Sequence, residues 1–124
     1  MKKIIFSLGT LLMLLAMVAC SGGVGKIESL TKDVEKNSEE WDTEKWENVL
    51  KEAYDTAIEF LDKSDIKEKD FEKMTDAMED FFEACRDSDS SKKYFKARGK
   101  KSIENLSEKY NKKVRKLNDK FNDE

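Results

Sequence analysis

The stretch WENVLKEAYDTAIEFL, residues 46–61, carries the strongest structural signal in the chain. Its apolar residues recur at intervals of three and four, which places them on one face of an α-helix. That face is made of Trp46, Val49, Leu50, Ala53, Tyr54, Ala57, Ile58 and Leu61, and Phe60 widens it. Asp42 or Thr43 is a candidate N-cap. The pattern predicts an amphipathic helix that ends near Asp62.

Three other segments show the same periodicity. Ile27, Leu30 and Val34 predict a helix over about residues 26–37, and a stripe from Phe71 to Cys85 predicts another over about 66–86. Asp65 and Glu68 have the spacing of a capping box for that helix. The polar run 87–91 is predicted to be a loop.

The last segment, about residues 92–122, has one apolar residue per turn from Phe95 to Phe121, with Gly99 on the same line. We expect one long helix of ~46 Å, bent near Gly99 or overhanging its neighbours. The chain has no proline, and no glycine lies between Lys26 and Arg98. The sequence therefore predicts an all-α fold, an antiparallel bundle of three or four helices with a long C-terminal helix.

The N-terminal residues have the order of a secretory signal. Two lysines, Lys2 and Lys3, precede the uncharged run 4–19, which is shorter than the ~20 residues of a spanning helix. The run ends in Met17-Val18-Ala19-Cys20, which resembles the lipobox of bacterial lipoproteins, although Met17 stands where leucine is usual. An ordinary cleaved secretory signal is the alternative.

The lipobox resemblance implies cleavage before Cys20 and attachment of a diacylglycerol thioether to its sulfur. Two or more acyl chains would anchor the protein stably. The implied organisation is a signal peptide (1–19), a lipidated cysteine with a glycine-rich tether (20–25) and a helical domain (26–124). Because Ser21 is not aspartate and residues 21–25 lack acids, analogy with lipoprotein sorting implies the outer membrane, facing the periplasm. The five-residue tether would reach at most ~17 Å.

Charge is divided unevenly along the chain. The net charge is -3, yet residues 92–124 carry +7 and residues 20–91 carry -12. The basic segment either packs against the acidic helices or presents a face for lipid phosphates or an acidic partner. Its candidate contact residues are Lys112, Lys113, Arg115 and Lys116. Nucleic acid is not expected as a partner, because the signal would export the chain.

Catalytic and metal-binding constellations are missing from the sequence. The chain contains no histidine, which excludes Ser-His and Cys-His pairs and the usual zinc and di-iron ligand sets. We therefore expect no enzymatic activity, no metal and no cofactor. Cys85 lies on an apolar stripe and is expected to be a buried, inert thiol, with an intermolecular disulfide or a redox role as the alternative. Trp41 either staples the entry of the following helix or is exposed as a partner contact.

The two tryptophans, Trp41 and Trp46, in a charged helical background running to Tyr54 resemble a family of small helical lipoproteins of gut anaerobes. The resemblance covers about residues 27–54. That family has no assigned activity, so it implies no functional residue. The leading hypothesis is a membrane-tethered, non-enzymatic module that binds or supports an envelope protein. The alternatives are a bundle that holds a lipid or another apolar ligand, and an inhibitor or immunity-type lipoprotein.

Overall fold

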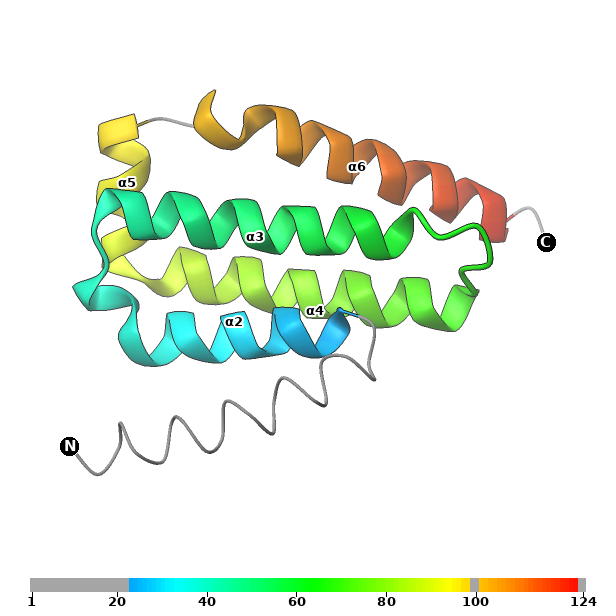
Figure 1. Cartoon of the computed structure of the whole chain (residues 1–124), viewed down its shortest axis with the longest axis horizontal. Helices are drawn as coiled ribbons and strands as arrows, with labels where there is room; N and C mark the ends of the chain where they lie inside the picture. Colours follow the sequence, from blue (N-terminus) through cyan, green and yellow to red (C-terminus); the bar gives the residue numbers. More distant parts are fainter. Residues whose placement is uncertain (1–22, 99–100, 123–124) are drawn as a thin grey trace.

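The computed structural model describes residues 23–98 and 101–122 of the chain. Its elements are α2 (Val24–Asn37), the 3₁₀ helix η1 (Ser38–Glu40), α3 (Thr43–Leu61), α4 (Glu68–Asp87), α5 (Asp89–Arg98) and α6 (Lys101–Asn122). These two ranges contain no strand. The predicted all-α class and the long C-terminal helix are therefore confirmed (Figure 1).

Four long helices lie side by side and form the body of the bundle (Figure 1). Successive long helices run in opposite directions, as predicted. α2 packs mainly against α4, and α6 packs mainly against α3. α5 crosses the end of the bundle at which α3 begins and α4 ends (Figure 1). The acidic helix α4 and the basic helix α6 therefore make few contacts with each other. Much of the surface of each helix is left open to solvent.

The core is built from the stripes that the sequence predicts. Trp46 of α3 and Met74, Met78 and Phe81 of α4 are completely or almost completely removed from solvent. Ile27 and Val34 of α2 close the core on one side, and Ile103, Tyr110 and Leu117 of α6 close it on the other. Burying one such side chain stabilises the fold by roughly 1.5–3 kcal/mol.

The start of α3 is confirmed in detail. Asp42 has extended backbone dihedral angles, and its carboxylate accepts a 2.8 Å hydrogen bond from the backbone N–H of Lys45. The start predicted for the next helix is wrong by two residues, because α4 begins at Glu68 and the side chain of Lys67 gives it no cap. The difference lies at Ile66. The prediction includes this residue in the helix, whereas the structure buries it in the loop before α4.

The prediction of one continuous helix over residues 92–122 is wrong, because α5 ends at Arg98 and α6 begins at Lys101. The change of direction between the two helices lies where the bend was expected, next to Gly99 (Figure 1). Gly99 itself lies outside the described residues. Tyr94 is buried and its hydroxyl makes a 2.6 Å hydrogen bond with the Ser102 hydroxyl, which links α5 to the first turn of α6. The break also removes the overhang, since the 22 residues of α6 span ~33 Å and match α3 and α4.

The predicted loop at 87–91 is also largely wrong. Only Ser88 separates α4 from α5, and Asp89 is already helical. Ser88, Ser90 and Ser91 are buried, although a polar run normally indicates exposure. Their hydroxyl groups form hydrogen bonds with side chains and backbone carbonyl groups nearby, as described below.

Gly23 fixes where the chain enters the bundle. Its φ of 107° is one that residues with a Cβ rarely adopt, and it occupies the N-cap position of α2. A Cβ built there would lie 3.3 Å from Thr56 Cγ2 and near Phe60 and Met74. Val24 and Gly25 belong to α2, so these two residues of the predicted tether are helical. Cys20, Ser21 and Gly22 lie outside the described residues.

Candidate functional site

The end of the bundle beneath α5 is held by a network of serine hydroxyl groups. Ser88 Oγ donates to Glu39 Oε1 at 3.0 Å, and Glu39 Oε1 also accepts from the backbone N–H of Asp89 at 3.2 Å. Because the Ser88 proton is used there, Ser38 donates the 2.9 Å bond between the two serines. Glu39 therefore caps α5 from about fifty residues away in the sequence.

A second part of the network joins α3 to α5. Trp46 Nε1 donates to Ser90 Oγ at 2.8 Å, and Ser90 Oγ donates to the carbonyl oxygen of Trp41 at 3.0 Å. Ser91 Oγ lies within hydrogen-bond distance of the carbonyl oxygens of Cys85 and Ser88. In the described residues no buried side-chain nitrogen or oxygen lacks a partner. This network is complete and offers no free polar group to a ligand.

Trp41 lies beside this network. Its ring packs edge-on against Trp46 with the ring centroids 4.9 Å apart, and Lys45 Nζ lies 5.4 Å from its centroid. The side chain is partly exposed. Trp41 therefore packs at the entry of α3, as the staple prediction has it, and part of its surface is exposed. A partner contact at that surface stays a prediction.

The four basic candidates on α6 do not behave alike. Lys113 Nζ forms an ion pair with Asp62 Oδ1 at the C-terminal end of α3. A hydrogen bond and the charge of Lys113, with a smaller contribution from Lys116, lower the pKa of Asp62. Lys112, Arg115 and Lys116 are exposed. Lys113 therefore packs the basic helix against the acidic body, and the other three remain accessible to a partner.

A lysine row runs along α6, formed by Lys109, Lys112, Lys116 and Lys120. The spacing of three, four and four places these side chains on one face of the helix, and all four are exposed. Lys112 and Lys116 form no ion pair in the part of the chain that the structure describes. Arg115 belongs to a neighbouring face. The row was not evident from composition alone, because the acids Glu104, Glu108 and Asp119 are interspersed in the same helix.

Trp41 and the lysine row do not form one surface. Trp41 precedes α3, whereas Lys113 contacts Asp62 directly after α3. The 19 residues of α3 separate these points by ~28 Å. A single small partner surface would not cover both predicted contacts.

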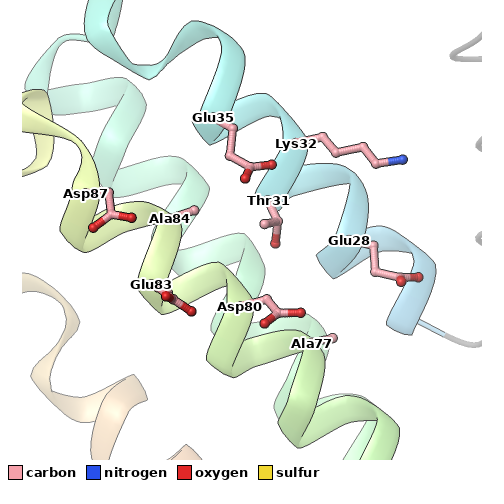
Figure 2. Close-up of a pocket in the computed structure, with 9 residues that line it drawn as sticks. All are labelled: Glu28, Thr31, Lys32, Glu35, Ala77, Asp80, Glu83, Ala84 and Asp87. Carbon is pink, nitrogen blue, oxygen red and sulfur yellow. The ribbon is translucent and has the colours of Figure 1, made fainter.

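An acidic groove of about 430 Å³ lies between α2 and α4 on another side of the bundle (Figure 2). Its lining carries the carboxylates of Glu28, Glu35, Asp80, Glu83 and Asp87, with Lys32 as a single cation. Figure 2 shows these side chains spread along both helices instead of converging on one point. No group of His, Cys, Asp or Glu in the described ranges could hold a metal ion. The groove is best described as a solvated acidic face.

An apolar pocket of about 270 Å³ lies where α3, α4, α5 and α6 meet. Its lining residues are Leu50, Tyr54, Phe82, Cys85, Arg86, Ser91, Lys92, Phe95 and Ile103. Burial raises the pKa of Cys85 to about 12 and also raises the pKa of Tyr54. Cys85 is therefore a protonated, weakly nucleophilic thiol at neutral pH. The sequence could not reveal this pocket, because its walls come from four separate helices.

No family model, curated protein or solved structure matches the chain. Among the described helices, none is long and apolar enough to cross a membrane. The candidate sites therefore have to be judged on their geometry alone. They are the lysine row on α6 and the apolar pocket beneath α5.

Proposed function

We propose that this protein is a lipid-anchored, non-enzymatic module of the bacterial envelope that binds an acidic protein partner through the lysine row. The basic start, the uncharged run and Cys20 support the anchor, with cleavage before Cys20 and acylation of its sulfur. The sorting analogy at Ser21 supports the outer membrane and a domain that faces the periplasm.

The lysine row is the observation that carries the binding proposal. Four lysines repeat along one face of α6, and the structure leaves them exposed. Lys113 already anchors α6 to Asp62, so the helix is held in place while its outer lysines face water. A row of ammonium groups on a rigid helix attracts a surface rich in carboxylates and speeds its association.

The anchor is tested by replacing the lipidated cysteine. Cys20→Ser should abolish acyl labelling and release the protein from membranes. Unchanged membrane fractionation and labelling of this variant would refute the lipoprotein assignment. Proteolysis of intact cells should spare the domain if it faces the periplasm, and rapid digestion would refute that orientation.

The binding surface is tested by photocrosslinking in cells. A photoreactive amino acid at position 112 should give one discrete protein adduct, and Lys109→Glu, Lys116→Glu and Lys120→Glu together should reduce its yield at least tenfold. The matched control is Lys67→Glu, Lys69→Glu and Lys73→Glu, which makes the same charge change at exposed residues at the beginning of α4 and just before it. The proposal would be contradicted if both triple variants lowered the adduct yield to the same extent. It would also be contradicted if the domain bound anionic vesicles and gave no protein adduct.

A second candidate function is to hold an apolar ligand. The apolar pocket favours it, because its walls include Leu50, Phe82, Phe95 and Ile103 and it lies between helices of the bundle, where helical proteins commonly bind small molecules. Ligand binding and partner binding would use different parts of the molecule. Loss of one function would therefore leave the other intact.

A further inference from the structure

The apolar pocket has two cationic side chains in an otherwise apolar lining. Leu50, Ile103 and Cys85 form buried parts of the wall. Arg86 and Lys92, from the end of α4 and the start of α5, are exposed. Because exposed charged groups remain in water, these two cations mark the solvent side of the pocket.

No acidic residue lines this pocket, which is unusual in a chain with 27 acidic residues. Arg86 forms no ion pair within the described residues, and Lys92 contacts only Asp89, at 3.4 Å, with both side chains largely in solvent. Such an exposed pair is worth at most about 1 kcal/mol and is easily exchanged for another anion. The two cations are therefore available to a ligand.

Few polar groups line the inner wall. The Ser91 hydroxyl lies against the carbonyl oxygens of Cys85 and Ser88, and the Cys85 thiol stays protonated. The Tyr54 hydroxyl is the other polar group of the wall, and it interacts with Ser107. A ligand with polar groups along its length would therefore lose more hydrogen bonds to water than this wall replaces.

The volume limits the size of the ligand. A dry apolar cavity of about 150 Å³ accommodates one benzene molecule, so 270 Å³ has room for a tail of roughly ten carbons. A phospholipid chain or a sterol would extend beyond this space, through its open side. Guanidinium and ammonium groups at the opening bind a carboxylate well, and Arg86 can do so through two parallel hydrogen bonds.

We infer that this pocket binds a medium-chain carboxylate of about eight to ten carbons, with the tail inside and the carboxylate at Arg86 and Lys92. The inference rests on the second candidate function, and it adds the chemical class of the ligand. Both parts of the ligand have a partner in the pocket: an apolar wall for the chain and two cations for the head.

The test uses the mature chain from residue 21, in buffer without detergent. Its buried hydrophobic core lies entirely between Ile27 and Leu117, so this chain contains the whole core that the structure describes. Isothermal titration calorimetry with sodium decanoate at pH 7.5 should show one site. Decanol should bind at least tenfold more weakly, and decyltrimethylammonium should not bind. Photolabelling with a diazirine-tailed decanoate should modify the peptides that contain Phe82 and Phe95.

The decisive variant is Arg86→Glu with Lys92→Glu, which should weaken decanoate binding at least tenfold and leave decanol binding unchanged. Its matched control, Lys73→Glu with Lys96→Glu, changes two exposed lysines of the same helices that do not line the pocket. Circular dichroism checks that each variant is folded. Equal affinity for decanoate and decanol would overturn the inference but keep an apolar ligand site. Binding of neither compound, or photolabelling of other peptides, would refute both the proposed ligand class and the apolar ligand site.

Discussion

Trp46 and Ser90 are joined by a 2.8 Å hydrogen bond from the indole Nε1 to the serine hydroxyl, although 44 residues separate them in the chain. Trp46 is completely buried and Ser90 nearly so. The bond ties the first turn of α3 to the first turn of α5 and fixes α5 across the end of the bundle. Because α5 forms one wall of the apolar pocket, this bond also holds the pocket in shape.

Ser90→Ala should therefore destabilise the protein. The substitution leaves the buried indole N–H and the carbonyl oxygen of Trp41 without their partner, which costs about 1–3 kcal/mol. Urea unfolding followed by tryptophan fluorescence measures the change. Ser64→Ala in the exposed loop between α3 and α4 is the control and should change stability by less than about 0.5 kcal/mol. Equal stability of the two variants would show that the hydrogen bond does not contribute to the free energy of unfolding.

Gly23→Ala should destabilise the start of α2. Alanine at a φ of 107° is strained, and its Cβ would lie 3.3 Å from Thr56 Cγ2. Together these effects should cost about 1–3 kcal/mol. In a Thr56→Ser background the methyl contact disappears while the backbone strain stays, so only part of the loss should be recovered. Complete recovery would assign the whole effect to the contact, and no loss at all would contradict the geometry.

The ion pair between Asp62 and Lys113 should be visible in the titration of Asp62. Lys113 lowers the pKa of this carboxyl below its ordinary value of 3.8, mainly through a hydrogen bond and then through its charge. The associated stabilisation is present above pH 3.8 and is lost as the pH falls through the lowered pKa. Lys113→Ala should return the pKa to near the ordinary value, and Lys116→Ala should move it less. Carboxyl chemical shifts measured by NMR test this order, and a larger effect of Lys116→Ala would contradict it.

Alkaline pH should destabilise the fold from about pH 9 upward. Burial raises the pKa of Cys85 from 9.0 to about 12, and it also raises the pKa values of Tyr54 and Tyr110 above 10. Between pH 9 and 12 the unfolded chain loses the Cys85 proton and the folded chain keeps it, so unfolding becomes more favourable by up to about 1.4 kcal/mol per pH unit.

Urea unfolding at pH 7–11 tests this dependence. Cys85→Ala should remove the part of the decline that begins near pH 9 and leave the tyrosine part above pH 10. Iodoacetamide should also label Cys85 far more slowly in the folded protein at pH 9 than in urea. Rapid labelling of the folded protein would mean that this thiol is neither buried nor protonated.

Local sequence patterns predicted the features that depend on neighbouring residues. The stripe from Trp46 to Leu61 predicted α3, and Asp42 predicted its cap, because both signals act within one helix. The same reasoning failed at residues 92–122. There Phe95 and Ile103 continue the apolar line of α6, so periodicity cannot distinguish one helix from two. Tyr94, which lies off that line, is buried, and the position of α5 depends on such contacts with other segments.

The functional surfaces were predicted less completely for the same reason. Lys112 and Lys116 could be identified as exposed candidates from charge alone, whereas the ion pair of Lys113 required the position of Asp62. The buried serines 88, 90 and 91 find partners that lie mostly 44–50 residues away, which a run of polar letters does not indicate. The apolar pocket needs four helices to form. Long-range packing therefore determines the sites, although short-range patterns determine most of the helices.

The position of Gly23 has a consequence for how a ligand would enter. With Cys20 acylated, only Ser21 and Gly22 lie between the lipidated residue and Gly23, and the three residue steps reach at most ~10 Å. The edge near Thr56, Phe60 and Met74 would then lie closest to the bilayer. Arg86 is twelve residues further along α4, ~18 Å from Met74. The opening of the pocket would thus face away from the bilayer, so its ligand would be exchanged through water, as suits a short, soluble carboxylate.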